Sequence, residues 1–374
     1  MDLARNNLLY INVFKGFLIS FVIIGHAILL VVPEVTGAAE RVFFGLLSKV
    51  LGPCVFGFFC FFGYSQGLGR QHVTKQKVRY RAKRMFISYI AWASIAWVAF
   101  FLLGSGYDAI NNTSSYTGGL FLPIDYLVSV FTFSISWQYY FIAIFLFAML
   151  GLLYFKDTPI ERLKGYVVVA VLLEFIFYYM ITEYLWTETP SHEALQRLGI
   201  LAYSNPLAWV IPLIWGYYKG ATKKELIENK HPFLYGILLI ACFVFSVVEI
   251  LFLSEKWEAF FVMDHFTVFS LLNSMMMMFL YSNCVKWLIS REKGWFLELM
   301  KKFSTMGRYS IIPFYIHMPY QWFIFYFFKK RFFPEISPLP AFFIISAIGL
   351  TLSYLSIFRI KKMPTKYKRL FIGI

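Results

Sequence analysis

Lys15 and His26, in the first long apolar segment of the chain, have the types and spacing to do chemistry together. They are eleven residues apart, so a helix with about 100° per residue would place both on one side, roughly 16 Å apart along its axis. A cation near a membrane surface and a titratable imidazole deeper inside would form the wall of a polar channel. The alternative is a lysine that reaches back to the surface and a hydrogen-bonded core histidine. The spacing alone leaves both interpretations open.

Arg81 and Arg84 form a second candidate group, on adjacent turns of one helix face ahead of the third apolar segment. Guanidinium groups suit phosphate oxygens, although basic residues at such a place also anchor a helix at the cytoplasmic surface. His317 is the other histidine inside an apolar run. It has no basic partner in helical register comparable to Lys15, so we expect its replacement to have a milder effect than that of His26.

The composition indicates which elements position these residues. Hydrophobic residues make up 59% of the 374 positions and charged residues 15%, against roughly 45–50% and 25% in soluble domains. Apolar runs of about 20 residues, long enough to cross a bilayer, recur along the chain. We therefore expect an all-α polytopic membrane bundle of about ten transmembrane helices, in a single domain over residues 1–374. The expected spans are 9–32, 43–68, 85–104, 126–155, 166–186, 198–218, 232–253, 266–289, 309–328 and 339–358.

The 35 Lys and Arg residues are unevenly distributed between these spans. Most fall in every second connecting segment and at the two ends of the chain, and the alternate segments hold few. By the positive-inside rule this places both termini in the cytoplasm. The same rule accounts for the net charge of +15, so we expect no nucleic-acid partner. The four cysteines fall inside apolar runs and predict neither a disulfide framework nor a metal site.

Five short patterns occur in order along the chain. They are Lys15 with His26, Phe61–Tyr64, Arg81 with Arg84, Trp137–Phe141, and Gly307–Ser310 followed by Tyr315 and His317. Together they resemble the acyltransferase-3 family of bacterial membrane O-acyltransferases, over nearly the whole chain. That family has a basic residue and a histidine in its first helix, a Phe-rich end of the second, and an Arg-x-x-Arg opening the third. Phe62 stands where the family has a serine.

The resemblance implies an enzyme that moves an acyl group, expected to be acetyl, from cytoplasmic acyl-CoA to a hydroxyl of a cell-envelope glycan or glycolipid. It implies a multi-pass protein of the bacterial plasma membrane that needs no metal. Some relatives carry an SGNH-type esterase domain, which we do not expect here. The implied roles are general base for His26, CoA phosphate binding for Lys15, Arg81 and Arg84, and contact with the acceptor for Tyr64, Trp137, Tyr140 and His317.

Several alternatives stay open at this level. His26 could carry the acyl group covalently instead of acting as a base. It could also be a proton relay in a transporter or exporter of a glycan or lipid, although such carriers have inverted repeats that this sequence does not display. A pH sensor that uses both intramembrane histidines is a third option. Three carboxylates are candidate partners of His26, and the sequence does not choose among Asp125, Glu174 and Glu249. The acyl group, the acceptor and homo-oligomer formation are also undetermined.

Overall fold

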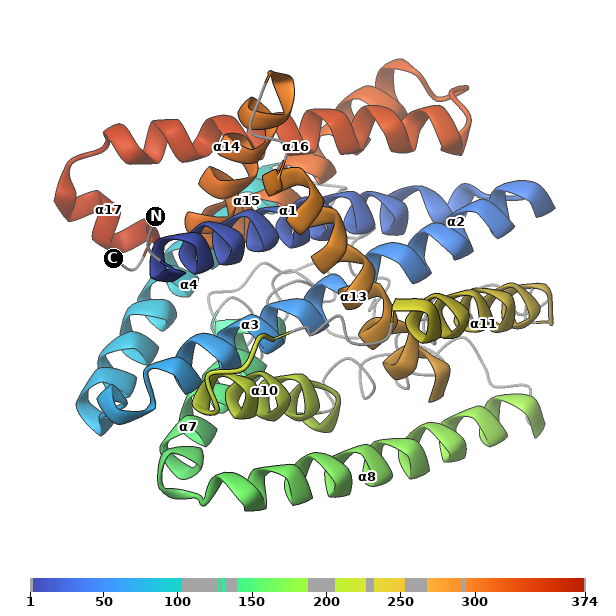
Figure 1. Ribbon diagram of the computed structural model, residues 1–374. Helices are drawn as coiled ribbons and strands as arrows, with labels where there is room; N and C mark the ends of the chain where they lie inside the picture. Colours follow the sequence, from blue (N-terminus) through green and yellow to red (C-terminus); the bar gives the residue numbers. More distant parts are fainter. Residues whose placement is uncertain are drawn as a thin grey trace.

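The computed structural model describes residues 3–102, 127, 130–131, 140–187, 206–226, 232–252, 268–290 and 294–372. These residues are almost entirely helical, and no strand occurs among them, which confirms the all-α membrane fold. Figure 1 shows many of the long helices running in a similar direction, with others crossing them obliquely, as expected of a membrane bundle.

The helix bounds agree with the expected spans to within a few residues at many ends. The helices are α1 (Leu3–Val31), α2 (Ala38–Leu51), α3 (Cys54–Leu68), α4 (Lys75–Leu102), α7 (Tyr140–Asp157), α8 (Ile160–Thr187), α10 (Pro206–Ala221), α11 (Pro232–Phe252), α13 (Val268–Ser290), α14 (Trp295–Arg308), α15 (Ile311–Ile324), α16 (Pro338–Lys362) and α17 (Thr365–Ile372). Short 3₁₀ turns, η1 (Val32–Glu34) and η2 (Arg70–His72), follow α1 and α3, and a π-helical segment, η5 (Phe325–Phe332), extends α15.

Three helical stretches in the described part of the chain are long and apolar enough to cross a membrane. They are Leu9–Glu34, Ala38–Leu68 and Pro338–Lys362. Helices also occupy part of every other expected span. The membrane character of the chain is therefore clear, and the count of ten spans stays a prediction.

The second expected span, residues 43–68, is broken into α2 and α3 next to Pro53. Proline has no backbone N–H and therefore cannot bond the carbonyl four residues earlier, that of Lys49. The side-chain amide of Asn273, on α13, donates to this carbonyl at 2.9 Å. A third helix thus satisfies the backbone group that the break would otherwise leave unpaired in an apolar environment.

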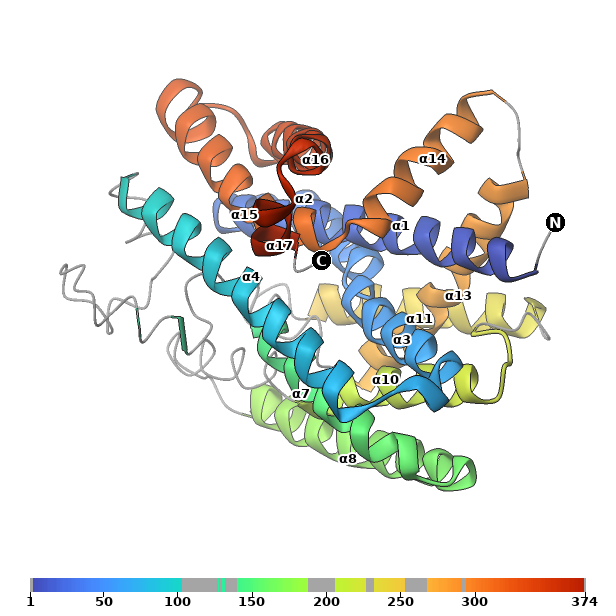
Figure 2. The same cartoon turned by 90° about the vertical axis from the view of Figure 1, so that its left-hand side faces the viewer.

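α1 lies in the middle of the bundle, with α14, α15 and α16 on one side and α3 and α10 on the other (Figures 1 and 2). α14 was expected only as part of an inner connecting segment, but it is a helix that slants onto α1. A side chain on Gly16 of α1 would collide with the backbone of Phe303, and one on Gly307 would collide with that of Asn12. These two glycines let the helix backbones touch, which fixes the end of α1 that carries Lys15.

α3 and α10 touch through four reciprocal glycines. Gly63 and Gly67 of α3 face the backbone of α10, and Gly216 and Gly220 of α10 face the backbone of α3. A Cβ atom on any of them would overlap a backbone atom of the other helix. This is the small-xxx-small packing that allows membrane helices to approach closely.

Segments predicted to lie on one side of the membrane meet one another. Lys286 Nζ lies 3.2 Å from Glu225 Oε2, and both residues belong to predicted inner segments or their edges. Lys329 Nζ lies 2.8 Å from Glu34 Oε2, and both belong to predicted outer segments. The two chain ends lie at the same end of the bundle in Figure 1.

Candidate functional site

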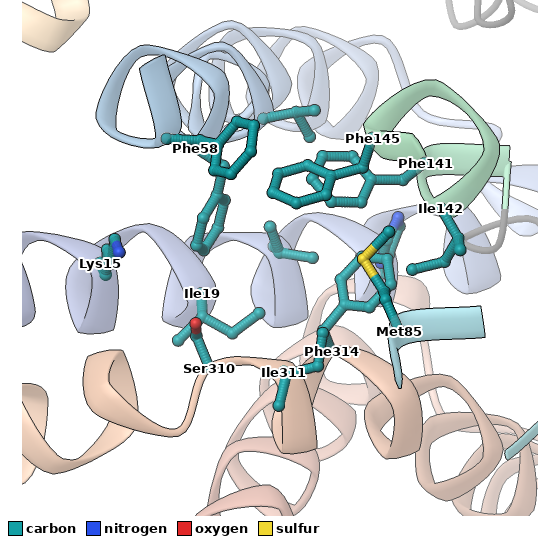
Figure 3. Close-up of a pocket in the computed structure, with 14 residues that line it drawn as sticks. Lys15, Ile19, Phe58, Met85, Phe141, Ile142, Phe145, Ser310, Ile311 and Phe314 are labelled. Atoms are coloured by element: carbon teal, nitrogen blue, oxygen red, sulfur yellow. The ribbon is translucent and has the colours of Figure 1, made fainter. Parts of the chain in front are cut away.

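A cavity of about 140 Å³ lies inside the bundle among α1, α3, α4, α7 and α15. Its walls are mainly aromatic and aliphatic, and its polar contributions come from Lys15, His26 and Ser310 (Figure 3). Lys15 lies at one end of the labelled group in Figure 3, whereas Ile142 and Met85 lie at the other. The lining residues are Lys15, Ile19, Val22, His26, Val55, Phe58, Phe62, Met85, Phe141, Ile142, Phe145, Ser310, Ile311 and Phe314.

Lys15 and His26 line this cavity together, as their spacing on one helix predicted. Ile19 and Val22, which lie between them on α1, line it too, so this face of the helix forms a continuous wall. The Lys15 ammonium forms no hydrogen bond or ion pair with another described residue. A cation without a counter-charge at the edge of an apolar cavity is suited to bind an anionic group of a ligand.

His26 makes a direct contact with the second intramembrane histidine. Its Nδ1 lies 2.7 Å from Nε2 of His317, and the two rings are nearly parallel, with centroids 4.9 Å apart. His26 is half-buried at the cavity, whereas His317 is fully buried behind it. The sequence had placed His317 among the acceptor-contacting residues and gave no sign of this pair, because α1 and α15 are far apart in the chain.

The hydrogen bonds of His317 determine which nitrogen of the pair carries each proton. Its Nδ1 lies 2.8 Å from the carbonyl oxygen of Pro313, which can only accept, so Nδ1 carries a hydrogen. In a neutral His317 the Nε2 atom must then accept, and the proton between the rings belongs to Nδ1 of His26. The remaining nitrogen of His26, Nε2, is therefore unprotonated. An imidazole in this tautomer can take a proton and share the resulting charge with its neighbour.

The two arginines stand beside the cavity, one helical turn or less from a lining residue. Arg84 directly precedes Met85, which lines the cavity. Its guanidinium lies over the Tyr80 ring, 5.0 Å from the centroid, and its Nη2 is buried with no hydrogen-bond partner in the described structure. Arg81 is exposed and donates to Oε1 of Gln66, on α3, at 2.8 Å. Donors remain on both guanidinium groups for an anion beside α4.

The other sequence candidates are placed less fully. Tyr64 is half-buried on α3 and does not line the cavity. Trp137 lies outside the described residues. Tyr140 begins α7, and its neighbour Phe141 lines the cavity, so the predicted segment does reach the site.

Of the three carboxylates considered as partners of His26, only Glu174 has a described side chain, which is buried in α8. Asp125 lies outside the described residues, as does the side chain of Glu249. One partner of His26 in the described structure is the imidazole of His317. Among the described residues, no group of three or more His, Cys, Asp or Glu side chains could hold a metal ion.

The geometry can be compared with known families at this point. The sequence matches the family model of an acyltransferase domain over residues 8–358, nearly the whole chain. The chain belongs to the acyltransferase-3 family. Its members are membrane O-acyltransferases, so this protein is one too. No curated protein and no solved structure was found to match the chain.

Residues from separate sequence motifs meet at this one site. The first-helix pair contributes Lys15 and His26 to the cavity, and the late pattern contributes Ser310 as well as the bonded His317. The rings of Phe58, Phe145 and Phe314 in the wall were not predicted, and Phe62 was noted only because it stands where the family has a serine. Phenylalanine is so abundant, at 44 residues, that the sequence holds no signal to separate these rings from lipid-facing ones.

Proposed function

We propose that this acyltransferase moves an acetyl group from cytoplasmic acetyl-CoA to a hydroxyl of a cell-envelope glycan or glycolipid, with His26 as general base. One observation carries the proposal. His26 lines the same cavity as a lysine that has no counter-charge among the described residues, and it is hydrogen-bonded to a second, fully buried imidazole. A transporter would need a proton relay between two sides, whereas family membership argues for an acyl transfer.

The chemistry of the pair fits a base that takes a proton and returns it. Nε2 of His26 accepts the proton of the acceptor hydroxyl while the hydroxyl oxygen forms a bond to the thioester carbonyl carbon. The carbon–sulfur bond then breaks, and the proton on His26 passes to the departing CoA sulfur. The reaction thus yields an ester and free CoA thiol with no net gain or loss of protons. His317 stabilises the imidazolium in between, because its Nε2 accepts the hydrogen on Nδ1 of His26.

The size of the cavity favours a short acyl group. An apolar protein cavity of roughly 150 Å³ holds a molecule of benzene, which has six non-hydrogen atoms. The cavity here is of similar size, about 140 Å³. It can take the acetyl group, the thioester sulfur and the two carbons that follow, but not a long acyl chain.

The positive groups fit a donor that enters from the cytoplasmic side. Lys15 lies at one end of the labelled group in Figure 3, and Arg81 and Arg84 lie on α4 within one turn of the lining residue Met85. Phosphate oxygens of CoA would pair with them through charge-assisted hydrogen bonds. We propose that both termini lie in the cytoplasm, as the distribution of basic residues predicts. We also propose that the protein lies in the bacterial plasma membrane, as membership of this family suggests.

The test is transfer of radiolabelled acetyl from acetyl-CoA by the purified protein in lipid nanodiscs, with envelope glycan or glycolipid fractions as acceptors. We expect labelled acceptor and free CoA in equal amounts, lost in the His26→Ala protein. A folded protein that neither binds CoA nor releases it in the presence of any acceptor fraction would refute the proposal.

A further inference from the structure

We propose that Gln321 is a positioning residue that holds His317 against His26 by tying α15 to α1. The inference rests on the proposed function, in which the histidine pair is the base. Gln321 is fully buried, and its side-chain Nε2 donates to the carbonyl oxygen of Ile23 at 2.6 Å. No part of the sequence patterns that resemble the family includes this residue.

The bond lies one helical turn from the histidine contact on both helices. Ile23 is three residues before His26 on α1, and Gln321 is four residues after His317 on α15. A single contact between crossing helices fixes a distance but leaves rotation about that contact free. Two contacts, each one turn apart on its own helix, fix the rotation of α15 as well. The 2.7 Å separation of the two rings depends on that rotation.

α15 needs such an external restraint because its own backbone ladder is interrupted. Pro319 lies between His317 and Gln321 and has no N–H to donate to the carbonyl of Tyr315. Beyond Ile324 the helix continues as the π-helical segment η5. Prolines and π-helical turns are places where helices bend. The bond from Gln321 to α1 crosses the helix at this weak point.

A glycine of α16, Gly349, leaves room for the Gln321 side chain. A Cβ atom on Gly349 would lie 3.0 Å from Cγ and 3.2 Å from Nε2 of Gln321. Those separations are tighter than ordinary carbon contacts, so a larger residue at position 349 would push the amide. Gln321 is therefore wedged between the backbone of α1 and the backbone of α16.

Burying the Gln321 amide costs free energy, and its hydrogen bond to α1 offsets that cost. Its oxygen, Oε1, is buried and has no hydrogen-bond partner among the described residues. A buried acceptor without a partner is unfavourable, and an apolar side chain of the same length would avoid it. Since the Ile23 carbonyl can only accept, the amide cannot turn over to relieve the oxygen. The glutamine is thus explained by what it donates rather than by the space it fills.

The principal test compares Gln321→Met with Tyr320→Phe, in full-length protein in nanodiscs. Methionine has nearly the same length but cannot donate. Tyr320→Phe removes the 2.8 Å hydrogen bond between the Tyr320 hydroxyl and the Ser356 hydroxyl of α16. That hydrogen bond does not involve α1. We expect Gln321→Met to lower kcat about tenfold or more with an unchanged KM for acetyl-CoA, because small misplacements of reacting groups are costly. Tyr320→Phe should keep kcat within about twofold. Equal kcat losses, or none in folded Gln321→Met protein, would overturn the inference.

A second measurement separates positioning from general stability. In a His317→Ala background, adding Gln321→Met should lower kcat by less than about a further twofold, because the histidine that Gln321 positions is gone. The same tenfold loss in both backgrounds would show that Gln321 does not act through His317. If Gln321→Met does not fold, Gly349→Ala displaces the same amide and should lower kcat in the same way. The proposed function itself would fail separately, through a His26→Ala protein that keeps normal turnover.

Discussion

Lys15 and His26 lie three turns apart on α1 and face one cavity, with the lysine at the end of the labelled group in Figure 3. The helix therefore presents a positive charge and a base along a single wall. A donor held by its phosphates near Lys15 would extend along this wall toward the imidazole. The roughly 16 Å between the two residues is the length that the thin arm of the donor has to bridge.

This relationship predicts that Lys15→Met weakens binding of the donor. A hydrogen bond to a charged group contributes about 1.5–3 kcal/mol, so we expect the affinity for CoA to fall by ~10-fold or more. Lys15→Arg keeps the charge and should change the affinity much less. Binding of CoA is measured by calorimetry. Lys301→Met, at an exposed position of α14, is the control, and a loss there as large as at Lys15 would point to a general charge effect.

The histidine pair predicts that both imidazoles are needed for transfer. Alanine at His26 removes the base, and we expect turnover per folded molecule to fall by ~10² or more, with CoA binding near normal. His317→Ala removes the group that stabilises the imidazolium, so we expect a loss of at least about tenfold. The double variant should be little worse than His26→Ala, because the two residues act as a unit.

Normal turnover in His26→Ala would contradict the mechanism, as would additive losses in the double variant. A structural histidine would give the opposite result from a base. Less folded protein would be recovered, and what remained would be active. Counting folded molecules by size-exclusion chromatography before each assay separates these outcomes.

The sequence was informative where one helix was enough and uninformative where two helices had to meet. The shared face of Lys15 and His26 follows from helical periodicity alone. The contact between His26 and His317 depends on how α1 and α15 cross, and no local pattern specifies that crossing. Pro53 could have signalled the break between α2 and α3, but the apolar stretch Ala38–Leu68 continues across it. The all-α fold was predictable because a bilayer restricts the chain to long apolar helices.

Arg81 and Arg84 predict a salt-sensitive contribution to donor binding. Replacing both with alanine removes two guanidinium groups within one turn of the lining residue Met85, so CoA affinity should fall. The difference from the unmodified protein should shrink at high salt, because ions screen exposed charges. Titration of CoA at low and high ionic strength checks this. An unchanged affinity in the folded double variant would exclude this pair as the phosphate site.

The orientation of the bundle is tested by labelling single cysteines in a protein from which Cys54, Cys60, Cys242 and Cys284 have been removed. Thr36 and Lys77 are both exposed, the first just beyond η1 and the second near the start of α4. We expect Thr36→Cys to react in intact cells with a thiol reagent that cannot cross the membrane, and Lys77→Cys to react only after the cells are opened. The reverse pattern would invert the topology and remove the cytoplasmic donor.

The contact between α3 and α10 predicts that Gly216 tolerates no side chain. A Cβ atom there would overlap the carbonyl of Cys60, and the backbone on both sides is held by the reciprocal glycines. Gly216→Ala must therefore push the helices apart, and we expect it to cost more than about 2 kcal/mol of stability, in the range of severe core overpacking. Gly165→Ala in α8 is the matched control, since nothing lies within 4 Å of a Cβ atom at that position. There the change should be neutral or should stabilise the helix by roughly 0.5–1 kcal/mol. Thermal unfolding in detergent measures both, and equal midpoints for the two variants would mean that α3 and α10 do not pack through their glycines.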